Sequence, residues 1–148
     1  MNRVERTELA REHLEQGNTL RVRALGASMA PLIRSGDVLH VERVTELVVG
    51  DVLLVEQGDD WWAHRLLDVS ESGRVVLRGD AHRQTDLPLP RDAVLGRVEA
   101  VERAGRMLRL DGWRARLVRG VSRVSVLGRP ILPELVALAR RLRPKRPA

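Results

Sequence analysis

Short runs of β-branched and aliphatic residues fill the middle of this chain, and most of them end at a cluster of glycine, aspartate or serine. Such runs are shorter than most helices of globular proteins and are typical of strands that turn back on themselves. We therefore predict a mainly β domain over residues 19–110, with a barrel-like or folded-over sheet of antiparallel or mixed strands. The expected strands are 20–25, 38–44, 52–56, 62–69, 74–78, 94–103 and 107–110.

A short helix is expected ahead of this domain. Asn2 and Glu5 have the spacing of a capping box, in which the two side chains satisfy free backbone N–H groups of the first turn. The charged run that follows ends at Gly17, a residue type that commonly terminates helices. The predicted bounds of this N-terminal segment are residues 1–18.

The pattern changes again beyond the predicted sheet. Over residues 111–143, apolar residues recur about every four positions with arginines between them, which predicts amphipathic helices. Their apolar face either packs on the β domain or contacts an anionic membrane or a partner protein. Residues 144–148 read PKRPA and are interpreted as a basic tail.

Composition narrows the classes of protein further. The chain has 148 residues, enough for a domain with a buried core, and only 2% aromatic residues, so that core must be aliphatic. The absence of cysteine excludes disulfides, thiolate metal sites and a cysteine nucleophile.

A net charge of +6, carried almost wholly by arginine, reflects either codon bias or attraction to an anionic surface. No stacking motif of a nucleic-acid-binding fold accompanies the arginines, so we expect no specific binding of nucleic acid.

Hydropathy bears on where such a chain would act. No stretch approaches the roughly 20 apolar residues that a membrane-spanning helix needs. The charged N-terminus also lacks the apolar segment of a secretory signal. We therefore expect a cytoplasmic protein, with peripheral contact to a membrane left open through the predicted C-terminal helices.

The stretch GASMAPLIRSGD, residues 26–37, places a serine between two predicted strands. A serine hydroxyl becomes a nucleophile with the help of a neighbouring base, which a third group often orients. The single lysine of the chain, Lys145, lies in the expected basic tail, which argues against a Ser-Lys pair for Ser28. The base would then be one of the four histidines, His13, His40, His64 and His82.

These histidines differ in their surroundings. His13 lies on the charged N-terminal helix and is interpreted as a surface residue. His40 alternates with apolar residues in a predicted strand, and the sequence leaves its face open. His64 lies within WWAHRLL, where a buried imidazole needs a partner whether its role is structural or catalytic. His82 follows Asp80 in a loop and is compatible with exposure to solvent.

Several motifs appear in a fixed order along the chain: GASMAPLIRSGDVLHVERV, VGDVLLVE, AHRLL, LRGDAHRQTD and VLGRVEAV. Over residues 19–101 this order resembles the signal peptidase family, the S24/S26 serine peptidases. It is similar in particular to the ER-type branch, in which a histidine replaces the general-base lysine. The resemblance implies a compact signal-peptidase/LexA-like β-fold and a peptidase activity that needs neither metal nor cofactor.

Carried over residue by residue, the resemblance implies roles for four side chains. Ser28 of the Ser-Met-x-Pro motif matches the nucleophile of the family, and His64 of the His-Arg pair matches the ER-type general base. Asp80 matches the acid of the Gly-Asp motif, and Asp86 falls where a second aspartate follows. Either aspartate could hold the imidazole in the required tautomer, and each could equally form a turn after a strand. The sequence does not choose between them.

The same resemblance implies supporting roles for groups beside the nucleophile. Met29 and Pro31 match positions that shape the loop beside the nucleophile. The backbone amide of Ser28 resembles an oxyanion-hole donor. Arg65 is expected to pair with a carboxylate or a loop carbonyl near the site, without taking part in the chemistry.

We interpret the chain as a serine endopeptidase with a Ser-His-Asp mechanism that cleaves a protein or peptide substrate. Without an expected membrane anchor, a specialised maturation peptidase fits better than a secretory enzyme. Self-cleaving LexA-type repressors of the same family carry a DNA-binding domain, and we expect none in the residues ahead of position 19. The alternative is an inactive β scaffold that binds a protein or peptide partner.

Overall fold

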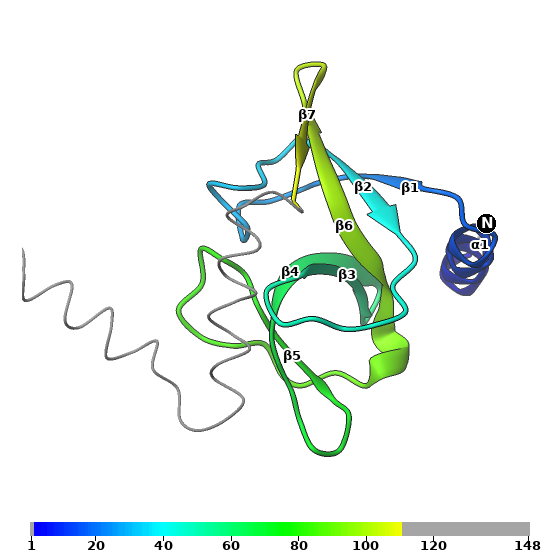
Figure 1. The fold of residues 1–148 in the computed structure, drawn as a ribbon, viewed down its shortest axis with the longest axis vertical. Helices are drawn as coiled ribbons and strands as arrows, with labels where there is room; N and C mark the ends of the chain where they lie inside the picture. The colour runs from blue at the N-terminus through cyan, green and yellow to red at the C-terminus, as the bar shows by residue number, and fades with distance from the viewer. Residues whose placement is uncertain (1, 111–148) are drawn as a thin grey trace, which may run out of the picture.

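The described part of the chain, residues 2–110 of this computed structural model, is built on one antiparallel sheet of seven strands (Figure 1). In space the strands follow the order β1-β2-β6-β3-β4-β5, and β7 also pairs with β6. The predicted mainly β fold is confirmed, and each predicted strand has a counterpart. The strands are β1 Leu20–Arg23, β2 Val38–Glu42, β3 Val52–Gln57, β4 Asp60–Val69, β5 Val75–Arg78, β6 Val94–Arg103 and β7 Arg106–Arg109, and a short 3₁₀ helix, η1, spans Arg91–Ala93.

The sheet bends around β6, which pairs with three other strands. Residues 94–97 of β6 pair with β3, residues 97–102 pair with β2, and residues 100–103 pair with β7. Shifts of register occur where β2 and β3 meet β6, and such irregularities bend a sheet. At Gly96 the backbone of β2 comes so close that a Cβ atom would lie 2.6 Å from the carbonyl oxygen of Glu42. A glycine is therefore required at this crossing.

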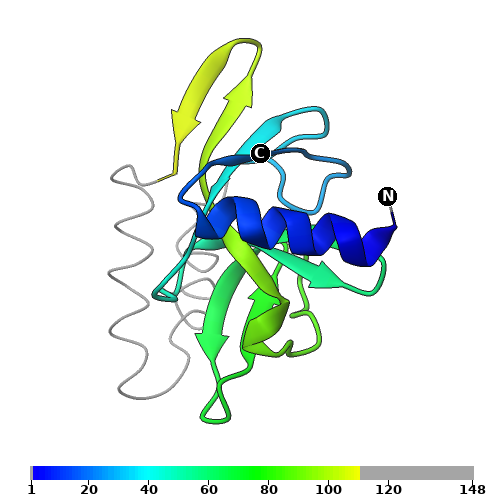
Figure 2. The same cartoon turned by 90° about the vertical axis from the view of Figure 1, so that its right-hand side faces the viewer.

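One helix, α1 Arg3–Glu15, packs against the side of the sheet (Figure 2). Its N-terminus has the predicted capping box, in which the side chains of Asn2 and Glu5 each accept a hydrogen bond from the backbone N–H group of the other. The buried residues of the helix are Thr7, Ala10 and Leu14. The helix therefore contacts the rest of the fold through a narrow face.

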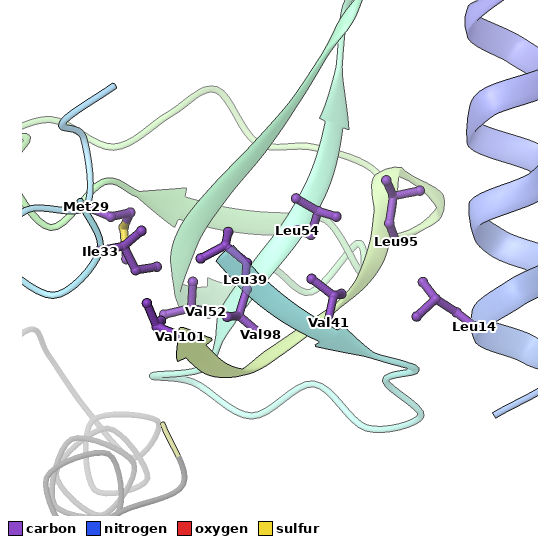
Figure 3. Close-up of a cluster of buried hydrophobic side chains, with 10 residues drawn as sticks. All are labelled: Leu14, Met29, Ile33, Leu39, Val41, Val52, Leu54, Leu95, Val98 and Val101. Atoms are coloured by element: carbon purple, nitrogen blue, oxygen red, sulfur yellow. The ribbon is translucent and has the colours of Figure 1, made fainter. Parts of the chain in front are cut away.

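Two clusters of buried aliphatic residues form the core, as the low aromatic content predicts. β3 separates them, because Val52 and Leu54 enter the larger cluster while Leu53 and Val55 enter the smaller one. The larger cluster, shown in Figure 3, consists of Leu14, Met29, Ile33, Leu39, Val41, Val52, Leu54, Leu95, Val98 and Val101. Because it contains a residue of α1 and residues of the loop after β1, it ties both segments to the sheet.

The C-terminal predictions concern residues that the structure does not describe. The amphipathic helices expected over 111–143 and the basic tail at 144–148 lie outside the described residues. The last strand, β7, ends at Arg109, close to the predicted end of the β domain at residue 110. Within residues 2–110, no helix has the length and apolar character needed to cross a membrane.

The loop between β1 and β2 is closed by a buried carboxylate. Asp37 accepts hydrogen bonds from the Nε and Nη2 atoms of Arg103 at 2.8 and 2.6 Å, and from the backbone N–H group of Arg34 at 2.7 Å. The side-chain hydrogen bonds from Arg103 lower the pKa of Asp37, although burial opposes this effect. β6 therefore holds the far end of the loop that contains Ser28.

Replacing this carboxylate should destabilise the fold in a pH-dependent way. Because the pKa of Asp37 is lower in the folded chain than in the unfolded chain, ionised Asp37 stabilises the fold at neutral pH. That contribution is lost as the pH falls below about 4, the ordinary range of an aspartate, towards the lowered pKa. We expect Asp37→Asn to lower the Tm by several degrees at neutral pH and by less near pH 3, as measured by circular dichroism.

The control for this measurement is Asp92→Asn, at an exposed position of η1. It should leave the Tm nearly unchanged at both pH values. An equal loss of Tm for Asp37→Asn at neutral and acidic pH would contradict the role given to the charge.

Candidate active site

Ser28, His64 and Asp86 come from three separate segments and form one chain of hydrogen bonds. The Nε2 atom of His64 lies 3.0 Å from the Oγ atom of Ser28, and its Nδ1 atom lies 2.5 Å from a carboxylate oxygen of Asp86. Ser28 lies in the loop after β1, His64 lies in β4 and Asp86 lies in the loop after β5. An ionised carboxylate only accepts hydrogen bonds, so Nδ1 carries the proton and Nε2 accepts from the serine hydroxyl. This arrangement can take up the hydroxyl proton of Ser28.

The imidazole at the centre of this chain is held on several sides. His64 is 1% exposed, and both of its ring nitrogens have a partner, as a buried imidazole requires. The rings of Trp62 and His82 each meet it edge to face, with centroids 5.5 and 5.7 Å away. The ring therefore has a fixed orientation before any substrate binds.

Asp80 has a different partner from Asp86. Its two carboxylate oxygens accept hydrogen bonds from the Nε and Nη2 atoms of Arg65, each at 2.7 Å. The Nη1 atom of the same guanidinium donates to the carbonyl oxygen of Gly50 at 2.8 Å. Arg65 thus pairs with both a carboxylate and a loop carbonyl, the two alternatives left open by the sequence. The carboxylate of Asp80 holds the loop after β5, while that of Asp86 contacts His64.

Backbone packing positions Ser28 against the loop after β5. The N–H group of Ala81 donates to the carbonyl oxygen of Ser28 at 2.9 Å. At Gly79 a Cβ atom would lie 2.6 Å from that same oxygen and 3.1 Å from the Cβ atom of Ser28. Real Cβ atoms do not approach backbone oxygens so closely, so only glycine fits between these two segments.

The residues around Ser28 form a tight turn. Met29 is buried in the larger core cluster, and its sulfur accepts from the backbone N–H group of Asp80 at 3.4 Å. Pro31 is exposed and follows a cis peptide bond from Ala30. Gly26, with a φ of 81°, begins the turn in the left-handed region that glycine adopts readily. The Met29 side chain therefore links the turn both to the core and to the loop of Asp80.

A groove of about 590 Å³ opens beside Ser28 and His64. One wall is residues 22–28 at the end of β1, and the other is residues 60–64 of β4. Its apolar lining includes core residues of the larger cluster: Met29, Ile33, Leu39 and Leu54. A peptide chain lying in this groove would pass the hydroxyl of Ser28.

The other histidines have other surroundings. His40 pairs through Nε2 with Glu102 at 3.0 Å, and His13 lies 3.1 Å from the carbonyl oxygen of Thr19. Neither lines the groove, whereas the exposed His82 does. Within residues 2–110, no group of three or more histidine, aspartate or glutamate side chains is placed to bind a metal ion.

Reasoning from the sequence did not assign a role to the tryptophans. Trp61 and Trp62 both line the groove, and Trp62 also contacts His64. The one available signal was that these two share the strand of His64 in a chain with few aromatic residues. That signal cannot distinguish a groove wall from a core position.

Comparison with known proteins adds the family. Residues 2–99 match the family described as Peptidase S24-like. The chain belongs to this family. No curated protein and no solved structure matches the chain significantly. Membership of the Peptidase S24-like family suggests peptidase activity in general, and the matched residues include Ser28, His64 and Asp86.

The close approach at Gly79 can be tested by adding one methyl group. We expect Gly79→Ala to push Ser28 away from His64 and to remove most labelling of Ser28 by a serine-directed covalent probe, because the new Cβ atom would clash with a backbone oxygen. The measurement is the labelling rate, normalised to the folded fraction from circular dichroism.

Gly96→Ala is a matched control, because a Cβ atom there would also lie 2.6 Å from a backbone oxygen, but in the crossing of β2 and β6. It should lower the Tm and leave the labelling of the folded fraction near the wild-type rate. Equal labelling of both variants would show that Gly79 does not position Ser28.

Proposed function

We propose that this chain is a serine endopeptidase in which Ser28 is the nucleophile, His64 the general base and Asp86 the residue that orients the base. The observation that carries the proposal is the hydrogen-bonded chain from Ser28 through His64 to Asp86 beside an apolar groove. A serine next to a base that a carboxylate orients is an arrangement that supports acyl transfer.

The reaction follows from this geometry. The Oγ atom of Ser28 attacks the carbonyl carbon of the scissile bond as its proton moves to Nε2 of His64. The imidazolium then gives that proton to the leaving amine, and the C–N bond breaks to leave an acyl-enzyme. A water molecule repeats the attack with His64 as base and releases the acid and the free serine. Asp86 stays ionised throughout and stabilises the imidazolium.

The backbone of Ser28 supplies a further group. Among the described residues, its N–H group has no hydrogen-bond acceptor, whereas its carbonyl oxygen is bound by Ala81. A free amide beside the nucleophile is a donor for the negative oxygen of the tetrahedral intermediate. The proposal therefore assigns this amide to the oxyanion hole.

The strand edges beside the groove favour a polypeptide substrate. β4 pairs with β5 only from Arg65 onward, and β1 pairs only with β2. In the described structure, residues 60–64 and β1 thus each present an edge without a neighbouring strand. An extended peptide can form main-chain hydrogen bonds with such an edge. This supports a protein or peptide as the substrate class.

The nucleophile and base can be tested without knowing the substrate. A fluorophosphonate probe should label Ser28 in the wild-type chain, because the hydroxyl is activated by His64. Ser28→Ala should abolish labelling, and His64→Ala should slow it by about a thousandfold or more. Undiminished labelling of His64→Ala would show that His64 is not the base, whereas no labelling of the wild type would favour the inactive binding scaffold.

The two aspartates should differ sharply in the same assay. Asp86→Asn should reduce turnover by about ten-thousandfold, because an amide favours the wrong tautomer of His64. Asp80→Asn should cost far less in turnover but should lower the Tm, because Asp80 pairs with Arg65 rather than with the base. The measurements are labelling rate, turnover and thermal unfolding, and a larger rate loss for Asp80→Asn would reverse the assignment.

A further inference from the structure

Trp61 connects helix α1 to the groove. Its indole lines the groove and also packs on the larger core cluster. Leu39 and Leu54, both nearly fully buried, line the same space. An aromatic ring at this position provides a large apolar surface, and its orientation determines the shape of the wall.

The orientation of that ring is set by α1, which lies more than fifty residues away in the sequence. The Nε1 atom of Trp61 donates to the Oγ1 atom of Thr7 at 3.3 Å, and that hydroxyl donates to Glu56 at 2.9 Å. Thr7 is buried, so its hydroxyl needs these partners. The guanidinium of Arg6 lies over the ring, 4.7 Å from its centroid, in cation–π geometry. The indole is therefore held both at its N–H group and across its face.

The hairpin of β3 and β4 is anchored to the same helix. Glu56 and Trp61 face each other in the register of the two strands. Arg3 pairs with Glu56 and with Asp59 at the tip of the hairpin, and Arg6 donates to the carbonyl oxygen of Asp59. These contacts fix the position of the strand that forms one wall of the groove. α1 thus supports the wall as well as the ring in it.

We propose that Trp61 is a specificity-determining residue that receives an apolar side chain of the substrate, and that Thr7 and Arg6 are its positioning residues. The inference rests on the proposed peptidase function. The lining around Trp61 favours an apolar partner because the nearby groove residues include core leucines. Contacts of Thr7 and Trp61 do not include Ser28, His64 or Asp86 among the described residues, so the effect should fall on substrate binding rather than on chemistry.

The test compares Thr7→Val with Thr7→Ser on a fluorogenic peptide library in which each position is varied. Valine keeps the shape of threonine but removes the hydroxyl, whereas serine keeps the hydroxyl. We expect Thr7→Val to raise KM about five- to tenfold for peptides with a large apolar side chain, with kcat and fluorophosphonate labelling unchanged. Thr7→Ser should restore the wild-type KM. Thr45→Val, at an exposed position outside the groove, is the matched control and should have no effect.

A second pair of variants tests whether the effect passes through the indole. Trp61→Phe removes the N–H donor, so Thr7→Val added to it should raise KM no further. Additive effects of the two substitutions would overturn the proposed contact. If kcat and labelling fall while KM rises, the variant has lost structure in general, and the proposed contact is also overturned.

The fluorescence of Trp61 tests this inference without depending on cleavage of a substrate. In a Trp62→Phe, Trp113→Phe background, Trp61 is the remaining tryptophan. We expect Thr7→Val to increase quenching of its emission by acrylamide, and library peptides with apolar side chains to protect it in the parent background. Absence of cleavage and labelling in the wild type would refute the peptidase, while these two readouts would still test the groove. Unchanged quenching and no protection would refute the role of Trp61.

Discussion

The close contact between Gly79 and the backbone of Ser28 is the constraint on which the site depends. It joins the loop after β1 to the loop after β5, and the hydrogen bond from Ala81 to the Ser28 carbonyl fixes their relative position. The first loop brings the hydroxyl and the second brings Asp86, so both partners of His64 are placed by one backbone contact. The buried imidazole of His64, which β4 supplies, is then flanked by these two segments.

Charged pairs hold the outer parts of these loops. Asp37 and Arg103 close the loop of Ser28 onto β6, and Asp80 and Arg65 close the second loop onto β4. Both pairs involve two hydrogen bonds from one guanidinium, which gives fixed geometry as well as attraction. The carboxylate of Asp86 lies outside these pairs and contacts the imidazole. Three similar carboxylates thus have different partners, since two bind a guanidinium and the third contacts the imidazole of His64.

The sequence predicted all seven strands because their alternation and their glycine turns are local signals. It also indicated Ser28 and His64 as candidate site residues, because the order of motifs can be read without knowledge of the fold. It left Asp80 and Asp86 as alternatives, because the choice depends on how the loop after β5 folds. That loop returns to the sheet through the N–H group of Asp86, which donates to the carbonyl oxygen of Leu77, and no spacing rule encodes this contact.

The contact of α1 with the groove wall has no clear signal in the sequence. Its apolar stripe is weak, because one large aliphatic side chain, Leu14, enters the core, and much of its attachment is polar, through Arg3, Arg6 and Thr7. Polar attachment has a consequence for the groove, since hydrogen bonds depend on direction whereas the hydrophobic effect is non-directional. The wall at Trp61 therefore takes its geometry from a helix that contacts none of the reacting groups. If the groove binds substrate as proposed, changes in α1 would alter which side chain it accepts while the hydrogen-bonded chain of Ser28, His64 and Asp86 stays intact.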